Sequence, residues 1–190
     1  MKLLRVGEPG YEKPAIIDQD GKFRDLSSIV DDFSPITLNK NTKKKIKELD
    51  IKSLPRLDFN IRIGSCVTKP GNFFAIGLNY KEHAEETKSK VPENPIVFNK
   101  SVHSITGPND HVIIPKYSEK LDHEVEIAII IGEKAKRVSE KNAQDYVFGY
   151  CICNDISERD WQKNKGGQWV KGKSGDTFGP LGPYLVTKDD

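Results

Sequence analysis

The chain has 190 residues, 36% hydrophobic and 31% charged, and carries a net charge of +2 at pH 7. So small a charge argues against nucleic acid as a partner, and no apolar run approaches the roughly 20 residues of a membrane span. Three cysteines form no disulfide framework, and the opening apolar run is too short for a signal peptide, so we expect a cytoplasmic protein.

Residues 1–60 are predicted to form a small N-terminal α/β domain. Short runs of β-branched and apolar residues predict strands at residues 3–6, 14–18 and 22–26. A lysine-rich segment at residues 43–49 predicts a helix, with Asn41 or Thr42 as its N-cap.

Residues 61–190 alternate short β-like runs with segments rich in Gly and Pro. Strands are predicted at residues 73–78, 96–98, 111–114, 124–131 and 146–153. Short helices are predicted at residues 80–86, 140–145 and 157–163. This pattern predicts an all-β or β-rich core, and with the few short helices we predict a β-rich α+β fold.

The most apolar predicted strand begins with two acidic residues, Glu124 and Glu126. Because side chains alternate between the two faces of a strand, both carboxylates project from the same face. Two like charges held this close and partly buried raise each other's pKa or require a compensating cation. A hard divalent cation with oxygen ligands meets that requirement.

The predicted helix at residues 80–86 carries a second candidate site. His83 and Glu86 are three residues apart, so they are neighbours on one face of a helix. A carboxylate beside an imidazole makes it a better general base. An exposed surface pair is the alternative, and such pairs are common.

A third candidate lies at the end of the strand at residues 146–153. Asp155 could be a third oxygen ligand, with Arg159 one turn further on to bind a substrate carboxylate. The alternative is structural, because Asp155 or Ser157 could simply be the N-cap of the next helix.

Residues 167–174 match the P-loop pattern G-x-x-x-x-G-K-[ST] literally. A P-loop follows a buried strand and opens a helix, whereas here the preceding residues are polar and Gly179-Pro180 follows closely. We therefore do not expect nucleotide binding, although Lys173 could act as an isolated cation.

Taken together, these segments resemble the fumarylacetoacetate hydrolase family along nearly the whole chain. The matching motifs, in family order, are Gly77-Leu78-Asn79-Tyr80 with His83 and Glu86, residues 95–98 with Lys100, Gly107-Pro108, Asp122 with Glu124 and Glu126, Asn154-Asp155 with Ser157, Arg159 and Asp160, and residues 172–183.

The resemblance implies a core built on a rolled mixed β-sheet at residues 61–190, preceded by the small domain at residues 1–60. Family members are usually homodimers, and their chains continue through further strands beyond the point that corresponds to residue 190. We therefore expect the core to be incomplete at its C-terminal end.

The resemblance also implies a site that binds Mg²⁺ or Mn²⁺, or in some members Ca²⁺. Its ligands would be Glu124, Glu126 and Asp155. His83 and Glu86 would move a proton, and Lys173 would offset negative charge on the substrate. Further substrate contacts would come from Lys100 and Arg159.

The implied activity is that of a metal-dependent hydrolase or lyase, which cleaves a C–C bond of a 2-oxo or 1,3-dicarbonyl acid or acts on ureidoglycolate. One alternative is an isomerase or decarboxylase of a 2-oxo dicarboxylic acid in aromatic catabolism. Another is a metal-binding fragment without catalysis. In either enzymatic case the expected partner is a small oxo acid, with neither nucleic acid nor membrane involved.

Overall fold

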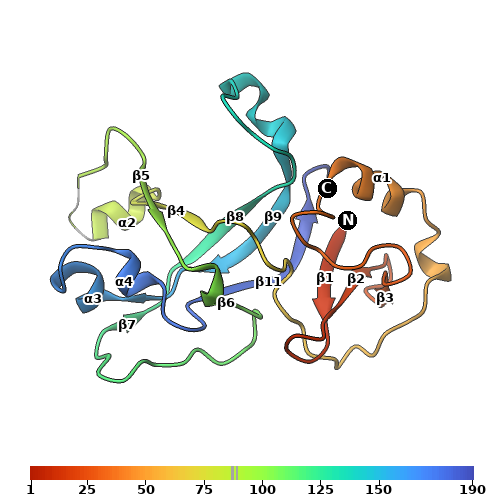
Figure 1. Cartoon of the computed structure of the whole chain (residues 1–190), viewed down its shortest axis with the longest axis horizontal. Coiled ribbons are helices and arrows are strands. Elements are labelled where there is room, and N and C mark those ends of the chain that lie inside the picture. The colour runs from red at the N-terminus through yellow and green to blue at the C-terminus, as the bar shows by residue number, and fades with distance from the viewer. Residues whose placement is uncertain (87, 89) are drawn as a thin grey trace.

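The fold is an elongated arrangement around one mixed sheet, with the N-terminal strands at one end and the short helices α2 (Lys81–Glu86), α3 (Arg159–Asn164) and α4 (Val170–Lys173) at the other (Figure 1). A computed structural model describes residues 1–86, 88 and 90–190, and at His83 it describes the backbone but not the side chain.

The strands follow the predicted alternation of short β-runs and turns. They are β1 (Lys2–Val6), β2 (Lys13–Ile17), β3 (Phe23–Asp25), β4 (Phe74–Gly77), β5 (Ile96–Asn99), β6 (Ile105–Thr106), β7 (Leu121–Asp122), β8 (Val125–Ile131), β9 (Val147–Asn154), β10 (Ser157–Glu158) and β11 (Gly179–Thr187).

The main sheet has the order β3-β2-β1-β11-β9-β8, and β6 adds to β11 in parallel while the other pairs are antiparallel. Two small sheets, β4-β5 and β7-β10, lie beside it at the helical end. The predicted β-rich fold with a mixed sheet is confirmed.

The N-terminal strands continue the main sheet, because β1 pairs with β11 through Lys2 opposite Val186 and Leu3 opposite Leu185. One apolar core also spans both parts, since Leu3 packs in the same buried cluster as Phe148. Whether residues 1–60 fold as a separate domain stays a prediction.

The helices are short. They are α1 (Lys40–Lys47), α2 (Lys81–Glu86), α3 (Arg159–Asn164) and α4 (Val170–Lys173), with 3-10 turns at Ile51–Ser53, Val102–Ser104 and Glu140–Tyr146. The predicted cap of α1 is wrong: Asn39 is the N-cap, and its side chain accepts a hydrogen bond from the Thr42 backbone N–H. Asn41 and Thr42 lie inside the first turn.

Two further expectations are corrected by long-range pairing. Residues 111–114 form no strand, and the Ile113 N–H instead donates to the Thr177 side chain. The helix predicted at residues 157–163 begins only at Arg159, because Ser157 and Glu158 pair as a strand with Asp122 and Leu121.

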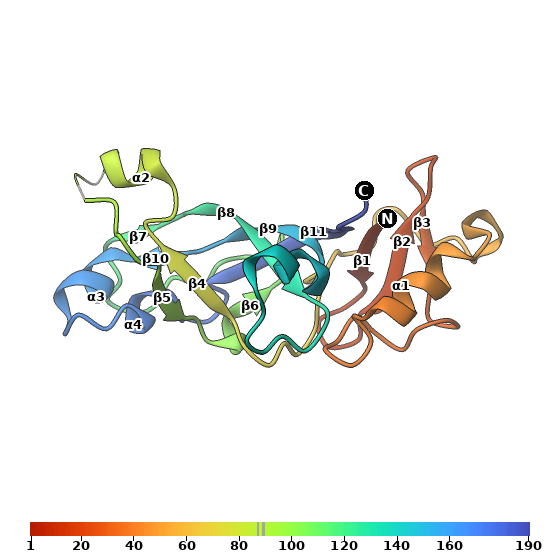
Figure 2. The same cartoon turned by 90° about the horizontal axis from the view of Figure 1, so that it is seen from above.

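The strand β8 alternates as predicted. Glu126, Ala128 and Ile130 are half-buried, whereas the residues between them face solvent and are more than half exposed. Seen from above, α2 stands over the β8 side of the molecule and α3 and α4 lie beyond β4 and β5 (Figure 2). The alternation therefore places Glu126 on the half-buried face of β8.

Within the described residues, no helix has the length and apolar character needed to cross a membrane.

Candidate metal centre

Antiparallel pairing of β8 with β9 brings the three predicted carboxylates together. Glu124 directly precedes β8, Glu126 is its second residue, and Asp155 directly follows β9. Val125 lies opposite Asn154, and the Asp155 backbone N–H donates to the Glu124 carbonyl at 2.8 Å. Residues some thirty positions apart in the sequence therefore become neighbours.

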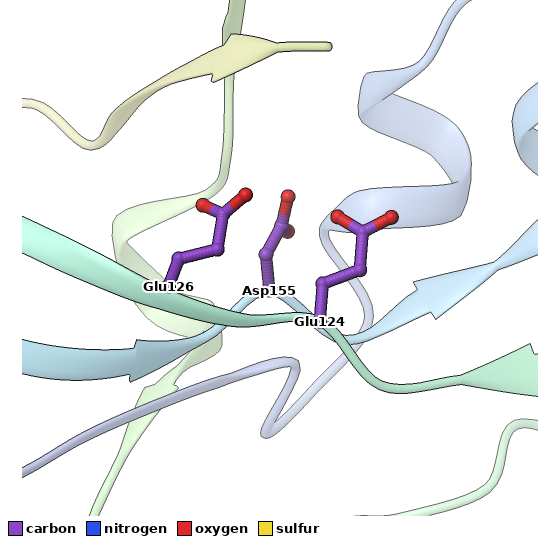
Figure 3. Close-up of side chains that lie close together, drawn as sticks. All are labelled: Glu124, Glu126 and Asp155. Carbon is purple, nitrogen blue, oxygen red and sulfur yellow. The ribbon is translucent and has the colours of Figure 1, made fainter. Parts of the chain in front are cut away.

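One carboxylate oxygen from each of these residues lies within 4.8 Å of the others. The three side chains point in the same direction, with Asp155 between the two glutamates in the view of Figure 3. Asp155 is 2% exposed, and both glutamates are half-buried. The predicted clustering of Glu124, Glu126 and Asp155 is what the structure shows.

Two buried lysines hold Asp155. The Lys173 ammonium lies 2.7 Å from Asp155 Oδ2 and 2.7 Å from Glu124 Oε2. The Lys100 ammonium lies 2.6 Å from Asp155 Oδ1 and donates to the Lys173 carbonyl at 2.5 Å. Burial lowers the pKa of Lys100, although Asp155 acts in the opposite direction. Each oxygen of Asp155 is thus fixed by one ammonium.

Arg159 holds the outer side of the cluster. Its guanidinium lies 2.6 Å from Glu124 Oε1 and 2.8 Å from Asp122 Oδ2, and it donates to Gln162 Oε1 at 3.2 Å. Burial raises the pKa of Glu124, but Lys173 and Arg159 outweigh burial and leave that pKa below its ordinary value. Glu124 is therefore a charged, well-compensated carboxylate.

Glu126 is the carboxylate without such compensation. In the part of the chain that the structure describes, no lysine, arginine or histidine side chain lies within salt-bridge distance of it. Burial, followed by the charges of Asp155 and Glu124, raises the pKa of Glu126 to about 7. A half-buried carboxylate beside two others is electrostatically unfavourable unless a cation joins it.

The cluster lies on the floor of a cleft of about 730 Å³. Besides the three carboxylates, the cleft is lined by polar groups from α3 and α4 and by apolar and aromatic side chains from β4, from the segment that follows it, from β5 and from the N-cap of α4. Among them are Ile76, Leu78, Tyr80, Phe98, Arg159, Gln162, Lys163, Trp169 and Lys173. A cleft of this size accommodates a small organic acid.

The donor set suits a hard divalent cation. Oxygen ligands at this spacing are the ones that Mg²⁺, Mn²⁺ and Ca²⁺ prefer. The lysine contacts do not exhaust the carboxylates, because each carboxylate oxygen has a second lone pair available for a metal. Glu126, Glu124 and Asp155 would hold the ion, and the neighbouring ammonium groups would fix the direction of Asp155.

The remaining predicted residues fall in different places. Glu86 is exposed on α2 and lines the cleft, as does Lys173 from α4. The side chain of His83 lies outside what the structure describes, so its pairing with Glu86 stays a prediction. Lys100 lies buried behind Asp155, 1% exposed, and is not among the residues that line this cleft.

Sequence reasoning did not single out Gln162, and it included Phe98 only within the family motif at residues 95–98, without a role. Gln162 follows Arg159 by three residues on α3, so helical periodicity could have placed the two side chains together. Phe98 belongs to β5, and no local pattern distinguishes a cleft-lining aromatic residue from one in the core.

Comparison with known proteins agrees with this architecture. The family described as fumarylacetoacetate (FAA) hydrolase C-terminal matches residues 72–190. A relative from Burkholderia multivorans, whose name assigns it only provisionally as a hydrolase, is 52% identical over all 190 residues, which span 67% of its length. The chain belongs to the fumarylacetoacetate hydrolase family.

Solved structures show the same fold. The fumarylacetoacetate hydrolase of Exiguobacterium antarcticum is 31% identical, with a TM-score of 0.84 over 100% of this chain and 67% of that one. A maleylpyruvate hydrolase of Sphingobium sp. SYK-6, solved with manganese(II) and pyruvate, is 24% identical, with a TM-score of 0.79 over 100% of this chain and 68% of that one. As the sequence led us to expect, these relatives are longer chains.

Proposed function

We propose that this chain binds a divalent cation at Glu124, Glu126 and Asp155. With that ion it acts as a hydrolase or lyase on a small 2-oxo or 1,3-dicarbonyl acid. The observation that carries the proposal is a carboxylate cluster with one uncompensated member, Glu126, on the floor of a cleft. The manganese ion and pyruvate in the maleylpyruvate hydrolase structure support both the metal and the substrate class.

A divalent ion bound here would supply a Lewis acid that polarises a substrate carbonyl. Lys173 places an ammonium next to the same position, 2.7 Å from both Glu124 and Asp155. When the C3–C4 bond of a 2,4-dioxo acid breaks, the electron pair left on C3 is delocalised onto the 2-oxo group as an enolate, while C4 is released as a carboxylic acid that takes its new oxygen from water. The Lys173 ammonium offsets the negative charge that develops there.

Arg159 orients the substrate in this proposal by binding its carboxylate. Its guanidinium is held by Asp122 and Glu124 at the edge of the cleft, so its direction is set before a substrate arrives. A guanidinium fixed in this way binds a carboxylate with less loss of side-chain freedom. The proton transfers belong, in this proposal, to His83 and Glu86 on α2.

The test is turnover of a panel of acylpyruvates, ureidoglycolate and diketo sugar acids with added Mg²⁺ or Mn²⁺, and again after chelation. We expect activity only with metal, and Glu126→Gln should remove it. Glu48→Gln, at the exposed C-cap of α1, is the matched control, and α1 lies at the opposite end of the molecule from α2 to α4 (Figure 1). Unchanged turnover by Glu126→Gln would refute the ligand assignment.

Product analysis separates the reaction types. Two smaller acids indicate C–C hydrolysis, carbon dioxide indicates decarboxylation, and an isomer of unchanged mass indicates isomerisation. Metal binding without turnover of any acid would favour the non-catalytic alternative.

A further inference from the structure

One wall of the cleft is aromatic, although its floor is charged. Phe98 from β5 and Trp169 before α4 stand edge to face, with ring centroids 5.4 Å apart and planes at 66°. Both rings are only half-buried and both line the cleft, together with Ile76 and Leu78. Beside the charged floor the pair forms an apolar surface that the metal proposal leaves unused.

The aromatic wall begins directly beside the charged floor. The Lys173 ammonium that contacts Glu124 and Asp155 also lies 5.3 Å from the centroid of Phe98. Trp169 extends the wall one ring further. A substrate whose oxo-acid end lies at the metal ligands and Lys173 therefore places its distal group against Phe98 and Trp169.

The position of the indole depends on a glycine. A Cβ added at Gly77, the last residue of β4, would lie 2.4 Å from Trp169 Cζ3, closer than side-chain carbons approach one another. Gly77 thus makes room for Trp169 to stand against β4. An indole packed this closely is a rigid surface whose shape a ligand can match.

Resting on the function proposed above, we propose that Trp169 and Phe98 form a specificity subsite that selects 2-oxo acids with an apolar or planar distal group. Hydroxyl groups placed against these rings would lose their hydrogen bonds to water, and the rings offer no hydrogen-bond partner in return. Acids that carry several hydroxyl groups should therefore bind more weakly. An aryl or alkyl group gains by leaving water and packing on the indole.

Binding of acids that cannot be cleaved tests the subsite without turnover. With saturating Mn²⁺, calorimetry would compare pyruvate, 2-oxo-4-phenylbutanoate and a dihydroxylated 2-oxo acid of similar length. We expect the phenyl compound to bind about tenfold tighter than the other two. Trp169→Ala should bring all three Kd values to within about threefold of one another.

Three further variants distinguish the effect of the Trp169 ring from effects of neighbouring residues. Trp169→Phe should retain most of the preference, because it keeps an aromatic face. Val170→Ala, next in sequence and absent from the cleft lining, should leave it unchanged. Gly77→Ala should reduce the preference by displacing the indole.

Equal affinities in the unsubstituted chain, or a preference that survives Trp169→Ala, would overturn the subsite alone. If none of the acids, including pyruvate, bound in the presence of Mn²⁺, the proposed function would fall together with it.

Discussion

Buried charges occur at both ends of this molecule, but they are arranged differently. At the N-terminal end, Arg5 contacts Asp32 and Glu12, and Arg62 contacts Glu12 and Asp110. Every carboxylate of that network touches a guanidinium. At the cleft, Glu124 contacts Arg159 and Lys173 and Asp155 contacts Lys100 and Lys173, whereas Glu126 has no cationic partner among the described residues.

This difference distinguishes a structural network from a binding site. A network in which every charge is paired stabilises one conformation and needs no bound ion to neutralise it. A carboxylate without a cation beside two other carboxylates raises the free energy of the folded state through desolvation and repulsion. A bound cation removes this unfavourable contribution. The comparison predicts that substitutions at the two ends should have separable effects on stability and on metal affinity.

The largest effect on stability should come from Arg5→Met. Removing this buried guanidinium leaves Asp32 without its cationic partner and Glu12 with Arg62 alone, which costs about 3–5 kcal/mol in the free energy of unfolding. Urea denaturation measures this loss, and Lys52→Met, in an exposed pair with Asp20, should leave stability nearly unchanged.

The metal affinity of folded Arg5→Met should equal that of the unsubstituted chain. A large fall in metal affinity with Arg5→Met would contradict the separation of the two networks.

Lys100→Met should act mainly on the metal centre. It removes the ammonium that holds Asp155 Oδ1 and the Lys173 carbonyl, so the ligand loses its fixed direction. Loss of such a supporting contact weakens metal binding by about 10–100-fold. Calorimetric titration with Mn²⁺ measures the change, and Lys44→Met on the exposed surface of α1 is the control. Equal affinities for the two variants would mean that Lys100 does not orient the site.

The smallest effect is a pH dependence of metal stabilisation. The pKa of Glu126 is raised to about 7, so without metal the folded chain keeps this proton between its ordinary pKa of 4.5 and about 7. The contribution of this group to stability is therefore full below pH 4.5 and is lost as the pH rises through 7. Metal binding must displace that proton below pH 7.

The rise in Tm on adding Mg²⁺ should accordingly be larger at pH 8 than at pH 5.5. Thermal melts at the two pH values measure it. A larger rise at the lower pH would contradict this account of Glu126.

Local patterns were enough to predict β1, β2, β3, β8 and β9 of the main sheet, though not β6 or the whole of β11, and the shared face of Glu124 and Glu126. The alternation of side chains along a strand is a local property, and it holds in β8. The approach of Asp155 was expected from the resemblance, and the register of β8 with β9 explains it.

Other features depend on distant partners, which local sequence does not contain. Ser157 and Glu158 begin a plausible helix but pair with β7, and tertiary pairing overrides the helical preference. Lys100 is 55 residues from Asp155, and nothing in its neighbourhood shows that its ammonium is buried there. The same holds for Trp169, whose indole lies against Gly77 of β4 and Phe98 of β5, both distant in the sequence.

Calorimetric titration of the 190-residue chain with Mn²⁺, beside Glu126→Gln and Glu48→Gln, tests the central claim most directly. The account predicts one saturable site in the unsubstituted chain and in Glu48→Gln, and an affinity lower by about 100-fold or more in Glu126→Gln. Equal Mn²⁺ affinity in all three chains would contradict it.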